Sequence, residues 1–300
     1  HRKLEMELTL FPLRRITLFL ALALAAPACR SETERLFAEA TRAEGADDYQ
    51  GAARRLREIV IADPGSPFAA RAQFELAQIH LLRTRDVTAA HAELVKVLDD
   101  HPDSPIAVPA HRLLARLYER ELQDPQRAVP HYLAVLEPEV AVDVERETLM
   151  SLGECYYRLE RLEEARAVYE KAVALPYNGA TDAAYFRLST LARLSGDSDS
   201  GLRWLEELSG RTTDSARRYT ALLGQVETLM SLERYSDAQE RLREAERLSP
   251  GAPENADLQA RLDTAQSGAF SMQGVDGQSE TLEELQARIH WGFGRSRKER

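Results

Sequence analysis

The amino-acid sequence predicts an all-α solenoid of about six helix-turn-helix units. Small residues recur every 36 to 38 positions, at Ala52, Ala90, Ala128, Ala165, Gly201 and Ala238. An apolar or aromatic residue follows each of them by four positions: Leu56, Leu94, Tyr132, Tyr169, Leu205 and Leu242. A further apolar residue follows by seven positions: Ile59, Val97, Val135, Ala172, Leu208 and Ala245. These offsets share one side of a helix, and self-similarity at this period is typical of helical solenoids.

A second set of small residues indicates the first helix of each unit. They lie 12 or 13 positions before the first set, at Ala40, Ala77, Ala115, Gly153 and Ser189. Two helix backbones approach closely only where small side chains meet, and larger side chains then fill the gap to the neighbouring helix. Because no single unit buries its apolar side alone, stacking of units is expected to build one continuous core.

The composition agrees with a folded chain of this kind. Of 300 residues, 44% are hydrophobic and 29% are charged, and the formal net charge is −10. This excludes collagen-like, disulfide-scaffold and wholly disordered chains. The acidic balance argues against a nucleic-acid-binding surface that covers the whole molecule.

The first 28 residues are expected to be a signal peptide for export. Arg14 and Arg15 precede the apolar run Ile16–Ala26, and small residues follow it. The run is too short for a permanent membrane span. Ala26-Pro27-Ala28-Cys29 is similar to the lipobox of bacterial lipoproteins, which implies a lipidated Cys29 followed by a tether over 29–34. The alternative is ordinary cleavage after Ala28, which would give a soluble periplasmic protein.

Arg30 follows the cysteine where some inner-membrane lipoproteins have Asp, so the periplasmic face of the outer membrane is the expected location. An adaptor in the cytoplasm would require that Ile16–Cys29 is not a signal. With Cys29 acylated, Cys155 is the remaining thiol, and it is expected to be a small buried residue.

The repeated pattern resembles the tetratricopeptide repeat (TPR), a helix-turn-helix unit of about 34 residues. The best copy, Leu149–Pro176, has Leu152-Gly153, Tyr156, Ala165, Tyr169 and Ala172, and Pro176 ends the second helix. The resemblance implies a superhelical solenoid with six repeats over 35–250.

Prolines and serines between the units predict helix ends. Pro64, Pro102 and Pro250 prevent the second helices from continuing. Ser66-Pro67 and Ser104-Pro105 supply an N-cap oxygen and a first-turn proline for the next helix. These junctions are loosely similar to those of BamD-type and CpoB-type outer-membrane TPR lipoproteins.

Three segments are expected after the repeats: a terminal helix over 251–265, a flexible linker over 266–279, and a short amphipathic helix with a basic tail over 280–300. Leu282, Leu285 and Ile289 share one side of the last helix. This helix is expected either to cap the last repeat or to contact a partner or anionic lipid.

The sequence carries no recognised catalytic or nucleotide-binding motif, and no cofactor or metal is expected. Five histidines between positions 80 and 131 lack the short pair spacing of a zinc site. In TPR proteins, first-helix positions at set offsets from the small residue face a concave groove. Carried onto this sequence, the resemblance implies these groove residues: Arg71, Phe74, Gln78, Arg112, Arg116, Met150, Glu154, Tyr157, Arg158, Phe186 and Arg193.

Five arginines and several aromatic residues on one side favour an anionic or extended peptide as ligand. The alternative is that these arginines are ordinary surface residues of helices. We therefore expect a non-catalytic interaction scaffold of the bacterial envelope that binds other envelope proteins. Two alternatives stay open: an accessory subunit of a periplasmic enzyme, and a pilotin-like secretion or pilus lipoprotein.

Overall fold

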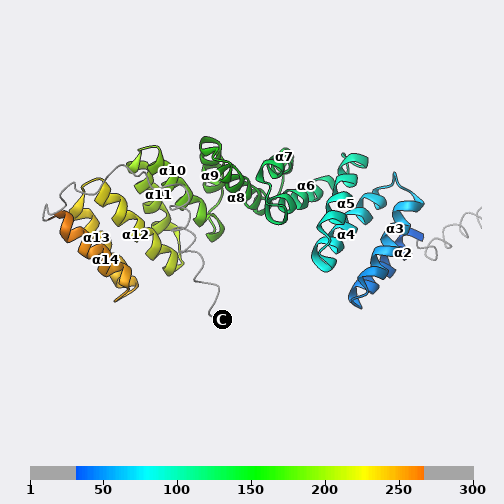
Figure 1. The fold of residues 1–300 in the computed structure, drawn as a ribbon, viewed down its shortest axis with the longest axis horizontal. Helices are drawn as coiled ribbons and strands as arrows, with labels where there is room; N and C mark the ends of the chain where they lie inside the picture. Colours follow the sequence, from blue (N-terminus) through cyan, green and yellow to red (C-terminus); the bar gives the residue numbers. More distant parts are fainter. Residues whose placement is uncertain (1–31, 267–300) are drawn as a thin grey trace, which may run out of the picture. The chain divides into compact units, whose positions relative to one another are not determined.

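The computed structural model describes residues 32–266, which form thirteen α-helices, α2 to α14, and no strand. The predicted all-α fold class is confirmed. The chain divides after Leu122 into two units, which are described separately. Within each unit, consecutive helices lie side by side as antiparallel pairs (Figure 1).

Unit 1 contains two helix pairs and one further helix. Its elements are α2 (Glu32–Gly45), α3 (Tyr49–Ala62), α4 (Pro67–Ile79), the π-helical turn η1 (His80–Thr84), α5 (Val87–Asp100), α6 (Ala107–Arg116) and the π-helical turn η2 (Leu117–Glu121). The π-turns directly extend α4 and α6, so each of these first helices ends in a wider turn.

Unit 2 contains three helix pairs between two single helices. Its elements are α7 (Pro125–Leu136), α8 (Val142–Arg158), α9 (Leu162–Ala174), the 3₁₀ turn η3 (Gly179–Thr181), α10 (Asp182–Leu194), α11 (Ser198–Arg211), α12 (Ser215–Ser231), α13 (Tyr235–Leu248) and α14 (Pro253–Gln266). The last helix packs on α12 and α13.

The small residues that recur in the sequence lie where helices touch, and all of them are buried. A Cβ atom added to Gly153 of α8 would lie 2.6 Å from the Tyr169 ring of α9. One added to Gly201 of α11 would lie 3.0 Å from the backbone oxygen of Ser189 in α10. The close approach of helices is therefore the reason for the small side chains.

Each turn between a first and a second helix contains one residue with positive φ. The φ angles run from 52° to 80°, at Asp47, Arg85, Gln123, Glu160, Gly196 and Glu233. Glycine occupies only one of the six positions, although the left-handed region favours it.

The π-turns explain the greater length of two units. The small residues of the first and second helix are 13 positions apart in Ala77–Ala90 and Ala115–Ala128, but 12 apart in the other pairs. A π-turn absorbs one additional residue without breaking the helix. The additional residue therefore enters at η1 and η2, and the second helices keep their register.

One of the two predicted serine caps is confirmed and the other is wrong. Ser66 Oγ accepts a hydrogen bond from the Ala69 N–H at 3.1 Å and caps α4. Ser104 does not cap α6, whose N-cap is Ile106. Ser104 instead accepts from Ile106 N–H through Oγ and from Ala107 N–H through its backbone oxygen, so it closes a turn before the helix begins.

Several predictions fall outside the described residues. These are the signal peptide over 1–28, Cys29, the first part of the tether, the linker and the segment 280–300. Between residues 32 and 266, no helix is both long and apolar enough to cross a membrane.

Candidate partner-binding surfaces

The predicted groove residues of unit 2 come from α8 and α10. Met150, Glu154 and Arg158 are four residues apart and share one side of α8, and Phe186 and Arg193 share one side of α10. Arg158 is exposed, and the other four are half-buried. We call these five residues the first-helix surface.

An ion pair joins the two helices of this surface. Nη2 of Arg187 in α10 donates to both carboxylate oxygens of Glu154 in α8, at 2.9 and 3.1 Å. The Tyr169 O–H of α9 donates to the same carboxylate at 3.2 Å. The Arg187 side chain is 11% exposed and that of Glu154 is 33% exposed. The pair therefore joins α8 to α10 in a partly buried setting, where an ion pair is screened less than on the open surface.

Tyr157, also predicted to face the groove, is fully buried beneath Arg187. The guanidinium carbon of Arg187 lies 4.3 Å from the centre of its ring. Burial raises the pKa of Tyr157, so the phenol stays protonated at neutral pH. Among the described residues, its Oη and Nη1 of Arg187 are buried without hydrogen-bond partners. Tyr157 therefore supports the surface from below.

In unit 1, the predicted residue Arg71 lies over an aromatic pair. Its guanidinium carbon is 4.7 Å from the Phe37 ring centre, and its Nε pairs with Glu75 at 2.8 Å. Phe37 of α2 packs against Phe68 of α4 with ring centres 6.3 Å apart. Phe68 is exposed at the surface.

The other predicted residues of unit 1 are half-buried: Phe74 and Gln78 on α4, and Arg112 and Arg116 on α6.

Carboxylates lie near Arg71 as well. Burial, and then the charge of Glu75, raise the pKa of Glu44. The predicted surface of unit 1 therefore carries acidic as well as basic side chains. It is less positively charged than its predicted arginines alone would make it.

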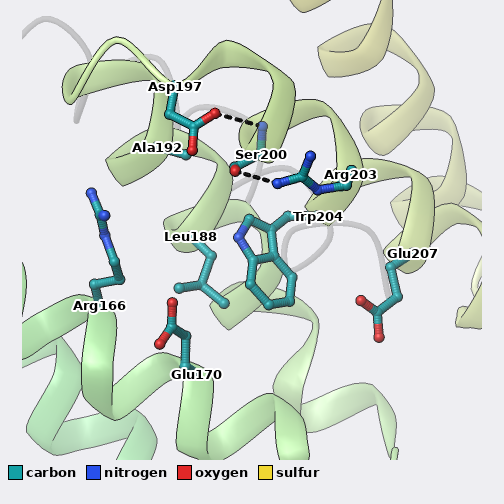
Figure 2. Close-up of a pocket in the computed structure, with 9 residues that line it drawn as sticks. All are labelled: Arg166, Glu170, Leu188, Ala192, Asp197, Ser200, Arg203, Trp204 and Glu207. Atoms are coloured by element: carbon teal, nitrogen blue, oxygen red, sulfur yellow. Dashed lines mark hydrogen bonds between the residues drawn. The ribbon is translucent and has the colours of Figure 1, made fainter.

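The structure has a pocket of about 450 Å³ between α9, α10 and α11 of unit 2 (Figure 2). Its lining residues are Arg166, Glu170, Leu188, Ala192, Asp197, Ser200, Arg203, Trp204 and Glu207. We call it the Trp204 pocket. The Trp204 ring packs edge-on against Tyr185 with ring centres 6.0 Å apart. Burial, and then the nearby Glu207 carboxylate, raise the pKa of Tyr185 to about 12, so its O–H donates to Glu207.

A second hollow, of about 380 Å³, lies where α7 leads into α8. It is lined by Leu136, Glu137, Pro138, Glu139, Val140, Glu145, Leu149 and Lys171. Four of these are consecutive residues of the connecting chain after α7, and the hollow offers no aromatic side chain.

The described residues hold no group of three or more His, Cys, Asp and Glu side chains arranged to bind a metal ion. Cys155 is buried in α8 and forms no disulfide with another described residue. Chemically, the arrangement is suited to contacts with another polypeptide, because aromatic and arginine side chains dominate such interfaces.

Comparison with known families decides the identity of the repeats. Residues 28–193, more than half of the chain, match the family described as tetratricopeptide repeat-like domain. The chain belongs to this TPR-like family. No curated protein matches the chain.

Solved structures similar to this chain include the following three. YrrB, described as a TPR protein with an unusual peptide-binding site, has a TM-score of 0.53 and 18% identity over 70% of this chain and all of its own. A TPR protein of Parabacteroides merdae has a TM-score of 0.49 and 16% identity over 87% of this chain and 98% of its own. PilF of Pseudomonas aeruginosa has a TM-score of 0.48 and 16% identity over 76% of this chain and 97% of its own.

Sequence reasoning missed Arg187 and Trp204 of this TPR-like chain. Arg187 occupies a first-helix position that the family pattern does not assign to the groove. The sequence therefore gave no indication that it belongs to this site. Trp204 had a signal, because it follows the small residue Gly201 by three positions. The equivalent residues in the other five units are Arg55, Glu93, His131, Val168 and Arg241. Four of these are polar, so the tryptophan departs from the pattern of the other units.

Proposed function

We propose that this TPR-like protein is a non-catalytic scaffold that binds a partner polypeptide in the bacterial envelope. The repeats account for nearly all of the described residues, which leaves no room there for an ordinary catalytic domain. YrrB, which shares the fold, is described with a peptide-binding site, and this supports a peptide as the class of ligand.

The observation that carries this proposal is the first-helix surface held by the Glu154–Arg187 pair. Arg158 is exposed and Arg193 is half-buried beside Phe186. Within residues 32–266, no carboxylate lies within ion-pair distance of Arg193. A peptide across α8 and α10 would place acidic or carbonyl groups against the arginines and an apolar side chain against Phe186. The fixed helices reduce the entropy that binding must overcome.

Charge reversal at this surface tests the proposal. In the variant Arg158→Glu with Arg193→Glu, partners cross-linked in intact envelopes should be lost, because both introduced glutamates would repel acidic ligand groups. Arg243→Glu is the matched control, since Arg243 is an exposed residue of the second helix α13. Equal capture by the wild type and the double variant would refute a ligand at this surface.

We further propose that Cys29 is lipidated and anchors the protein at the periplasmic face of the outer membrane. Each buried methylene of an acyl chain adds about 0.8 kcal/mol of membrane affinity. Cells grown with labelled palmitate should label the wild type and Cys155→Ser but not Cys29→Ser. Label that persists in Cys29→Ser would refute the anchor and would favour the soluble periplasmic alternative.

A further inference from the structure

The Trp204 pocket faces away from the first-helix surface. Along an α-helix each residue turns by about 100°, so Leu188 and Ala192 point roughly 130° around α10 from Phe186 and Arg193. Leu188 and Ala192 line the pocket. Any ligand of the pocket therefore contacts other residues than a ligand of the first-helix surface.

Two carboxylates flank the Trp204 ring. Figure 2 shows Glu170 of α9 on one side of the indole and Glu207 of α11 on the other, with Leu188 between the helices. Oε1 of Glu207 accepts from Tyr185 at 3.3 Å and pairs with Arg211 at 2.8 Å. In the part of the chain that the structure describes, Glu170 has no hydrogen-bond or ion-pair partner.

The two arginines of the pocket are already engaged at its rim. Nη2 of Arg203 donates to Ser200 Oγ at 2.5 Å, and Nη2 of Arg166 donates to Ser195 Oγ at 3.0 Å. The Asp197 carboxylate caps α11 by accepting from Ser200 N–H. The serine hydroxyls orient these guanidinium groups at the rim without neutralising them. Beside the indole, the Glu207 carboxylate pairs with Arg211, and the Glu170 carboxylate has no ion-pair partner among the described residues.

We propose that the Trp204 pocket binds a lysine or arginine side chain of a partner polypeptide. Tryptophan offers the best aromatic face to a cation, and the two carboxylates supply the opposite charge. A neutral apolar side chain would leave the Glu170 carboxylate unpaired, and an acidic one would be repelled by both carboxylates. The overall charge also favours a basic ligand, because residues 32–266 carry 42 acidic and 29 basic side chains.

Tryptophan fluorescence of the full chain tests the proposal directly. Trp204 and Trp291 are the two tryptophans, so Trp291→Phe leaves Trp204 as the reporter. The probes are three blocked octapeptides that alternate serine with lysine, glutamine or glutamate. The lysine peptide should change the Trp204 emission saturably, and added salt should weaken it. The glutamine and glutamate peptides should have no such effect.

Variants measured by calorimetry locate the contact. Trp204→Leu should weaken binding of the lysine peptide about five- to thirty-fold, because the cation loses its aromatic face. Trp204→Phe should retain more affinity than Trp204→Leu. Glu170→Gln with Glu207→Gln should weaken binding about three- to ten-fold. Glu206→Gln is the control, because this exposed neighbour of Glu207 does not line the pocket and should bind as the wild type does.

Three results would overturn the proposal. One is the absence of any emission change up to about 5 mM lysine peptide. Another is equal binding of the glutamine or glutamate peptide. The third is an equal loss of affinity in Glu206→Gln and in the Glu170/Glu207 double variant, since that would indicate attraction to the acidic surface in general.

Discussion

At the scale of single residues, Asp182 at the start of α10 is a buried carboxylate held by several partners. Its side chain is 1% exposed and accepts from Tyr177 Oη at 2.8 Å and from Thr212 Oγ1 at 3.3 Å. Arg217 of α12 pairs with it at 2.9 Å. These contacts join three successive elements of unit 2, because a buried carboxylate is tolerated only when its charge is paired and its oxygens are hydrogen-bonded.

Asp182→Ala should lower the free energy of unfolding by about 2–3 kcal/mol. This is less than the roughly 3–5 kcal/mol of a fully buried broken pair, because Arg217 is 40% exposed and regains water. Urea denaturation measures the change. Asp199→Ala, an exposed acidic residue of α11, is the control and should change stability by less than about 0.5 kcal/mol. Equal effects of the two substitutions would contradict the pairing role.

Two helical glycines make a matched pair for the close-contact argument. Gly153→Ala should destabilise by about 1–2 kcal/mol, since the new Cβ meets the buried Tyr169 ring. Gly210 in α11 has no atom within 4 Å of the added Cβ, so Gly210→Ala should stabilise by about 0.5–1 kcal/mol. Thermal unfolding distinguishes them, and a stabilised Gly153→Ala would show that the contact imposes no limit.

At the scale of elements, the turns between paired helices carry avoidable strain. Glu160 has φ 57° in the turn from α8 to α9, where Gly196 stands in the equivalent turn from α10 to α11. Glu160→Gly should therefore stabilise by about 0.5–1 kcal/mol, and Gly196→Ala should destabilise by about 1 kcal/mol. Differential scanning calorimetry of both variants is the measurement. A lower melting temperature for Glu160→Gly would show that the conformational entropy that glycine adds to the unfolded chain outweighs the strain relieved in the turn.

The recurring small residues could be placed from sequence because their position follows from one physical limit, the distance between helix backbones. The role of Ser104 could not be predicted from sequence, because a serine before a proline can either cap a helix or close a turn with the same side-chain oxygen. The additional residue before Ala90 was visible as a spacing, yet a spacing does not distinguish a longer loop from a π-turn. Tyr157 and Glu154 share the groove pattern, but only packing against Arg187 determines that Tyr157 is buried.

At the scale of the whole molecule, α14 completes the apolar core at the end of the described repeats. Leu258 and Leu262 of α14 are buried in one cluster with Val226, Leu229 and Leu242 of the preceding pair. Its remaining surface has no exposed large hydrophobic side chain. A cap over the last repeat is therefore present within the described residues.

Stacked repeats contact only their neighbours, so damage to the cap should spread over a short distance. Leu262→Ala removes buried methyl groups and should destabilise the end of unit 2 by about 2–4 kcal/mol. Hydrogen exchange should accelerate most in α12, α13 and α14, less in α8 and α9, and least in unit 1. Leu56→Ala, in the core of unit 1, is the reciprocal control and should accelerate exchange in α2, α3 and α4. If either substitution accelerated exchange equally in all helices, the two units would unfold as one cooperative body, and nearest-neighbour stacking would not describe this chain.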